Sequence, residues 1–233
     1  MSKDRFAAKR LRSIADELAP DKRAIIEKHS AFRSMLNVSP FNVPNELIDF
    51  VAVNTSHQLQ EFNYRGKRIV FTKEMVSKVF RIRSGDMPVN LLTRSVHSDL
   101  RDAYKGDLPR LPIENAAKML KTCNVQDEDA AIRTWDLLCW ATVLDPGTAN
   151  MMCLDYLGSM EEPKKAHEFD WDGHILVLVM RYVEKIQKKK QRPLVLEKGA
   201  TKFDFSIGGL LPFLAVSFFT LLCSHTYIVL LPS

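Results

Sequence analysis

DGHILVLVMRYVEKIQKKK, residues 172–190, is the stretch that decides the fold, because it predicts the longest helix of the chain. Its first half, Ile175–Met180, is apolar on every side, which is typical of a helix buried inside a domain. This apolar half ends at Arg181, well short of the roughly 20 residues that a helix needs to cross a bilayer core. We therefore expect residues 172–190 to form a central core helix.

Two more helices are predicted within residues 4–37, where apolar residues recur at mostly helical spacing. The pattern breaks at Ala19-Pro20, so we expect one helix before this break and one after it, both partly exposed. Pro44 is suited to the first turn of a third helix, which we expect to end near Asn54.

Residues 59–71 carry the clearest β signal in the chain. Partial alternation of apolar and polar residues flanks Arg65-Gly66, which predicts a β-hairpin in which Phe62 and Tyr64 share a face opposite Ile69 and Phe71. Thr72 is a suitable N-cap for a short helix directly after the hairpin.

The rest of the body is expected to be irregular over residues 81–112 and helical afterwards, since closely spaced Gly and Pro residues give way to longer apolar patterns. The fold class predicted from these patterns is mainly α: a helical domain with one small β-hairpin, plus a C-terminal apolar helix. The further helices expected in the body cover residues 91–104, 113–123, 127–144 and 149–160.

The end of the chain differs from the body, because residues 205–233 contain no Asp, Glu, Lys or Arg in a protein that is 26% charged. This run is longer than the roughly 20 residues that span a bilayer as a helix, and we take residues 207–230 as a candidate transmembrane segment. Gly208, Gly209 and Pro212 are tolerated in such helices. The alternative is a buried core helix of a soluble domain.

A basic cluster precedes this run and consists of Lys185, Lys188, Lys189, Lys190 and Arg192. Cations just before an apolar span favour the cytosolic side, which predicts a single-pass protein with its N-terminal body in the cytosol. The same cluster is also typical of a phosphate-contacting patch, a nuclear-localisation signal, or the solvated end of a helix. We expect four segments: a helical extension (1–31), the body (32–190), a basic linker (191–204) and the apolar tail (205–233).

No catalytic, cofactor-binding or metal-binding motif is found in the sequence. The four cysteines are widely spaced and lack zinc-site spacing or a protease-like partner order. The acidic residues Glu161, Glu162, Glu168, Asp170 and Asp172, with His167 and His174 nearby, suggest a metal or acid-base site. A solvated loop with an acidic start to the next helix explains them better. We therefore expect neither an enzyme nor a cofactor.

Several short motifs occur along residues 32–215 in a recognisable order. They are Phe32–Leu36, Pro44–Leu47, Arg65–Thr72 leading into Val76–Phe80, Leu154–Leu157, Asp170-Trp171 and Gly208–Ala215. Together they resemble the plant mobile domain, the "aminotransferase-like" region of transposon-derived plant proteins and of grass proteins that also carry a ubiquitin-like-protease domain.

This resemblance implies a mostly helical domain with interaction or genome-related roles and no established catalytic residues. In that family the helix that begins at Gly208–Ala215 continues with polar positions, whereas here it continues with the apolar residues after Ala215. The resemblance therefore raises the alternative that the tail is a truncated or mis-spliced core helix.

Two functional interpretations follow from the sequence. The first is a non-enzymatic, transposon-derived protein that is held at a lipid bilayer by its C-terminal segment and binds protein partners. The second is a soluble nuclear module that associates with DNA or with other proteins. Nucleic acid has the weaker support as a partner, because the basic residues form local clusters and no basic face is evident.

Overall fold

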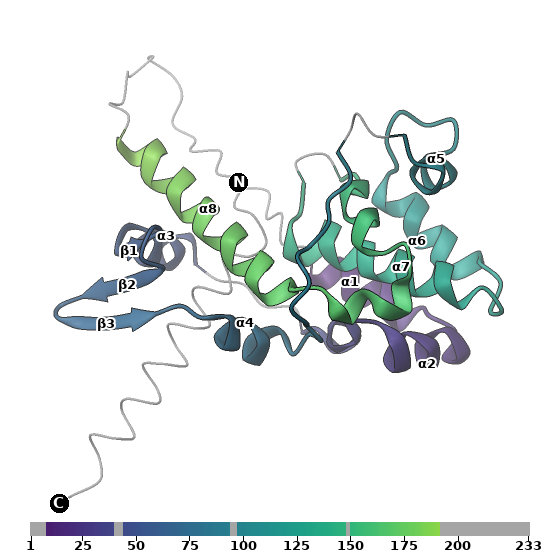
Figure 1. The fold of residues 1–233 in the computed structure, drawn as a ribbon, viewed down its shortest axis with the longest axis horizontal. Coiled ribbons are helices and arrows are strands. Elements are labelled where there is room, and N and C mark those ends of the chain that lie inside the picture. The colour runs from purple at the N-terminus through teal and green to yellow at the C-terminus, as the bar shows by residue number, and fades with distance from the viewer. Residues whose placement is uncertain (1–7, 40–43, 94–96, 148–149, 192–233) are drawn as a thin grey trace, which may run out of the picture.

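The computed structural model describes residues 8–39, 44–93, 97–147 and 150–191, and these residues form a mainly helical domain with a small three-stranded sheet (Figure 1). The α-helices are α1 (Ala8–Asp16), α2 (Pro20–His29), α3 (Asn45–Val53), α4 (Lys73–Phe80), α5 (Asp99–Lys105), α6 (Ile113–Thr122), α7 (Glu128–Cys139) and α8 (Trp171–Gln191). The strands are β1 (Thr55–Ser56), β2 (Glu61–Tyr64) and β3 (Lys67–Val70). Short 3₁₀ or π segments are η1 (Arg33–Asn37), η2 (Trp140–Leu144), η3 (Leu154–Ser159) and η4 (Pro163–Glu168).

The predicted hairpin is confirmed. Strands β2 and β3 are antiparallel with Phe62 paired to Ile69, and φ is positive at both turn residues, Arg65 (50°) and Gly66 (76°). Positive φ at both positions is the conformation of the two-residue turns that match strand twist. A third strand that was not expected, β1, pairs with β2 on the side away from β3. The outer edge of β3 is therefore the end of the sheet within the described residues.

Helix α8 connects the two halves of the domain. Figure 1 shows α8 leaving the helical lobe that contains α6 and α7 and passing α3 and β1. The Gln187 amide donates hydrogen bonds to the carbonyl oxygens of Ala52 (2.8 Å) and Thr55 (2.6 Å), which fixes the C-terminal half of α8 against the end of α3 and β1. The N-terminal half packs against α4.

The core is built around aromatic side chains. Trp140, Trp171 and Phe32 are fully buried, and their ring centroids lie 5.3–5.7 Å apart in edge-on or tilted arrangements. Trp140 reaches this position from the π segment η2, which extends α7 by an Asp145 N–H bond to the Trp140 carbonyl (2.8 Å). Trp135, one helical segment earlier on α7, is also fully buried.

The N-terminal helices contribute to the same core. Leu11, Ile14 and Ile26 are buried with the aromatic side chains, although helices α1 and α2 fall within the expected extension of residues 1–31. Lys22 of α2 donates to the carbonyl oxygens of Leu120 (3.0 Å) and Lys121 (2.5 Å) at the end of α6, where a cation is favoured by the helix dipole.

Some sequence-based expectations were wrong or only partly right. The helix expected over residues 149–160 is instead the 3₁₀ segment η3, and the helix expected over 91–104 covers only Asp99–Lys105. The long helix is confirmed as α8, but Val177 within its apolar half is 51% exposed, so this half is not buried on every side. None of the described helices is both long and apolar enough to cross a membrane. The basic linker after residue 191 and the apolar tail lie outside the described residues.

Candidate functional site

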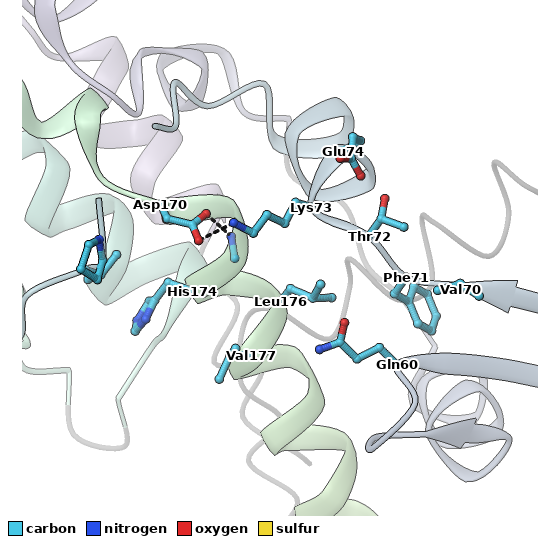
Figure 2. Close-up of a pocket in the computed structure, with 13 residues that line it drawn as sticks. Gln60, Val70, Phe71, Thr72, Lys73, Glu74, Asp170, His174, Leu176 and Val177 are labelled. Atoms are coloured by element: carbon cyan, nitrogen blue, oxygen red, sulfur yellow. Dashed lines mark hydrogen bonds and ion pairs between the residues drawn. The ribbon is translucent and has the colours of Figure 1, made fainter. Parts of the chain in front are cut away.

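An open pocket of about 650 Å³ lies between the end of β3, the first turn of α4 and the N-terminal half of α8 (Figure 2). We call it the β3–α8 pocket. Its lining residues are Gln60, Val70, Phe71, Thr72, Lys73, Glu74, Pro88, Val89, Asp170, Gly173, His174, Leu176 and Val177. This volume is in the range of pockets that bind small molecules or peptide side chains.

Local sequence signals place one wall of the pocket. β3 runs through Phe71 into Thr72, whose hydroxyl oxygen accepts from the Met75 N–H (3.4 Å) and caps α4 as predicted. The cap sets the direction of α4, so that Lys73 in its first turn reaches toward α8 (Figure 2).

The opposite wall begins with Asp170, the residue before α8. Its Oδ1 accepts from the Gly173 N–H (3.0 Å) at the start of the helix, while its Oδ2 lies 2.5 Å from Lys73 Nζ. The hydrogen bond to Asp170 raises the pKa of Lys73 above its usual value. A Cβ on Gly173 would lie 2.4 Å from Asp170 Oδ2 and 2.8 Å from Lys73 Cε. The Lys73–Asp170 ion pair can therefore occupy this position only because residue 173 is a glycine.

The middle of the pocket is apolar. Phe71 and Leu176 are buried, whereas Val70 and Val177 expose 46% and 51% of their surface to solvent. Figure 2 shows Leu176 and Val177 on α8, with Phe71 and Gln60 on the hairpin side of the same space. Lys73 and Asp170 neutralise each other at one end of this surface, and Glu74 adds a further carboxylate to the lining.

His174 lines the pocket and also belongs to a polar cluster with Asp145, Tyr156 and Tyr182. The Tyr156 hydroxyl is 3.2 Å from His174 Nε2 and donates to Asp145 Oδ2 (3.5 Å), and the Tyr182 hydroxyl donates to Asp145 Oδ1 (2.5 Å). Burial lowers the pKa of His174 and raises that of Tyr156. The ring of Tyr156 also stacks on Trp140 at 4.1 Å. Both tyrosine hydroxyls therefore converge on one carboxylate beside the core.

The hydroxyl and the imidazole that line the pocket are engaged within the domain. The pocket's hydroxyl, on Thr72, caps α4, and its His174 imidazole is hydrogen-bonded to Tyr156, so neither is arranged as a nucleophile with its base. In the part of the chain that the structure describes, no three His, Cys, Asp or Glu side chains are placed to hold a metal ion.

The acidic stretch before α8 divides into two groups. Glu161, Glu162 and Glu168 are exposed, as expected for a solvated segment. Asp172 lies in the first turn of α8, as expected for an acidic start to the helix, but it is only 9% exposed. Burial, and then the charge of Asp170, raise the pKa of Asp172 to about 6.

The basic cluster predicted as a membrane-flanking or phosphate-contacting site lies at the other end of α8. The Lys185 ammonium lies 5.1 Å from the centroid of the Tyr182 ring, and Lys188 Nζ is 2.5 Å from Glu184 Oε1. Lys189 and Lys190 belong to the last turn of α8, but their side chains and all of Arg192 lie outside the described structure. The two described cations are thus already engaged with their own helix.

Sequence reasoning missed the pocket because its walls are far apart along the chain. Asp170 follows Lys73 by 97 residues, and no local pattern joins them. The sequence could have indicated that Asp170 caps the long helix, because an Asp three residues before a helical N–H is a typical N-cap. It could not have indicated the ion pair with Lys73. The convergence of Tyr156 and Tyr182 on Asp145 likewise depends on how η2, η3 and α8 pack.

Residues 4–215 match the family model described as a domain of unknown function, DUF8566. The match covers most of the chain and extends past the end of α8 into the uncharged run. No curated protein and no solved structure matches the chain significantly.

Proposed function

The chain belongs to the DUF8566 family, and we propose that it is a non-catalytic interaction domain that its uncharged C-terminal run attaches to a membrane. The observation that carries the attachment is the run itself, since residues 205–233 contain no Asp, Glu, Lys or Arg. The run comes after the cationic end of α8 in the chain. An apolar run of this length inserts favourably, and the preceding cations favour a cytosolic body.

The interaction role is supported by the β3–α8 pocket. It combines exposed apolar side chains at Val70 and Val177 with an ion pair that is internally satisfied. Such a surface binds an apolar partner without the groups needed for a reaction. The proposed resemblance to the plant mobile domain fits a binding role of this kind.

Membrane attachment is tested with the full-length chain carrying an N-glycosylation acceptor appended after Ser233. We expect the protein to stay with microsomal membranes after carbonate extraction and the acceptor to become glycosylated, since a cytosolic body places the C-terminus across the membrane. The variant Leu221→Asp/Leu222→Asp should lose both properties, because each charge at the centre of a span costs about 2.5–3.5 kcal/mol. Complete release of the unsubstituted chain by carbonate would refute the attachment.

The second candidate, a soluble nuclear module that binds DNA, is favoured by the basic cluster at residues 185–192. Binding through phosphates would weaken steeply as salt rises, which filter binding to duplex DNA measures directly. DNA binding has less support from the described residues than membrane attachment has. The reason is that Lys188 is paired with Glu184 and Lys185 lies over the ring of Tyr182. No binding at low salt would remove it.

A further inference from the structure

We infer that the β3–α8 pocket is the docking site of residues 205–215 of the same chain, FSIGGLLPFLA. Docking would complete the domain by covering the apolar side chains that the pocket exposes. The apolar occupant of the pocket is thereby named as a segment of the same chain, in place of a separate partner. The inference goes beyond membrane attachment, because it concerns the first part of the uncharged run and would hold with or without a bilayer.

The pocket has the character of an incompletely covered core. Val177 is 51% exposed, although its helix neighbours Leu176 and Leu178 are only 5% and 6% exposed. Val70, at the end of the edge strand β3, is 46% exposed beside the buried Phe71. Covering both valines and filling a space of about 650 Å³ would remove apolar surface from water, which is the main favourable term in docking.

The extent of the family identifies the segment that belongs to the domain. The family match continues beyond Gln191, the last residue of α8, and ends at residue 215. A domain buries its apolar surface in its own core, so a segment that belongs to the family's unit is expected to pack on that unit. The uncharged run therefore has two parts: residues 205–215 inside the family's boundary and residues 216–233 outside it.

The chain is long enough for this return. Val177 lies about 21 Å back along α8 from Gln191, at 1.5 Å per residue. Residues 192–207 can extend over about 50 Å, at roughly 3.3 Å per residue. They can therefore turn at the end of α8 and bring Gly208 alongside the pocket without strain.

Charge complementarity favours this segment over an ionic partner. Lys73, the cation of the lining, already forms an ion pair with Asp170 at 2.5 Å, and the lining also contains a second carboxylate, Glu74. A phosphate or an acidic peptide would have to break this pair, whereas FSIGGLLPFLA carries no charge to be neutralised. If residues 205–215 dock, residues 216–233 remain for the bilayer, at the short end of the lengths that can span it.

The test is site-specific photo-cross-linking in the full-length protein, purified in detergent, with a benzophenone amino acid replacing Val177. Docking predicts an intramolecular cross-link that maps to residues 205–215 by mass spectrometry. The same probe at Val125, exposed in the loop between α6 and α7, should not label this segment. The added substitutions Leu211→Asp and Phe213→Asp should lower the yield at Val177 at least five-fold.

Three results would overturn the inference. The first is a cross-link between two chains, which gives twice the mass and indicates a second copy in the pocket. The second is a cross-link to detergent or lipid only, and the third is a cross-linking yield that the Leu211→Asp/Phe213→Asp pair does not change. Because the readout is the cross-linked peptide, its outcome is independent of whether the chain resists carbonate extraction. Failure of docking and failure of membrane attachment are therefore separate results.

Discussion

Lys73 Nζ lies 2.5 Å from Asp170 Oδ2, which joins the first turn of α4 to the residue that precedes α8. Asp170 also accepts from the Gly173 N–H and so caps α8. One carboxylate thus fixes the start of the longest helix and its position relative to the hairpin, and both determine the shape of the β3–α8 pocket.

The two roles of Asp170 predict unequal costs for its loss and for the loss of Lys73. Asp170→Ala removes both the cap and the ion pair, and should lower the free energy of unfolding by about 1–2 kcal/mol. Lys73→Met removes only a half-exposed ion pair and should cost under about 1 kcal/mol. Urea unfolding of the full-length protein in one detergent measures both. Lys165→Met, which breaks the exposed pair with Glu162, is the control and should change nothing measurable. Equal costs for Asp170→Ala and Lys73→Met would contradict the capping role.

Asp136 predicts a dependence of stability on pH. Its side chain is fully buried, which raises the pKa of this carboxyl from 3.8 to about 8, against the opposing hydrogen bonds from the Ser30 hydroxyl and the Ala31 N–H. The folded state therefore holds a proton that the unfolded state has released. The stabilising contribution of protonated Asp136 is complete below about pH 4 and is lost as the pH rises to about 8. Over this range the free energy of unfolding falls by at most about 1.4 kcal/mol per pH unit.

Asp136→Asn keeps the shape of the protonated acid but does not titrate. The difference in unfolding free energy between this variant and the unsubstituted protein should shift in favour of the variant from pH 5 to pH 8. Asp172, with its pKa raised to about 6, and His174, with its lowered pKa, titrate in both proteins and cancel in this difference. Asp129→Asn, an exposed site on α7, is the control. A difference that stays constant with pH would show that Asp136 does not titrate as its burial predicts.

The features predicted correctly from the sequence are those set by residues close together in the chain. Thr72 caps α4 because a hydroxyl three residues before a free N–H is a local arrangement, and Arg65-Gly66 forms a turn because the flanking strands alternate around it. The failures are non-local. In the range 149–160, where an α-helix was expected, Leu154–Ser159 form a 3₁₀ segment in which Tyr156 stacks on the distant Trp140. The pocket likewise needs contacts that α8 makes with distant elements.

Gly85 predicts a packing defect on substitution. It lies against the segment before α8, where its N–H donates to the Phe169 carbonyl (2.9 Å), and an added Cβ would lie 2.2 Å from the Glu168 carbonyl oxygen. Backbone atoms cannot move aside as a flexible side chain can, so Gly85→Ala should cost about 1–3 kcal/mol. The matched control is Gly147→Ala, whose Cβ would meet its nearest neighbour at 3.9 Å. Thermal unfolding of the two variants measures the difference, and equal midpoints would contradict the close approach at Gly85.

The convergence of two tyrosines on Asp145 predicts an order of effects. The Tyr182 hydroxyl donates to Asp145 Oδ1 at 2.5 Å, whereas the Tyr156 hydroxyl lies 3.5 Å from Oδ2 and closer to His174. A short hydrogen bond to a carboxylate is worth more than a long one, so Tyr182→Phe should destabilise the fold by about 1–2 kcal/mol. Tyr156→Phe keeps the stack on Trp140 and should cost less.

Urea unfolding at pH 7 measures these effects, with Tyr64→Phe in the hairpin as the control for removing a hydroxyl far from Asp145. In the background Asp145→Asn, Tyr182→Phe should lose about half or more of its effect, because the charge that strengthens the hydrogen bond is gone. An unchanged effect in that background would contradict this account, because it would show that the contribution of the Tyr182 hydroxyl does not depend on the charge of Asp145.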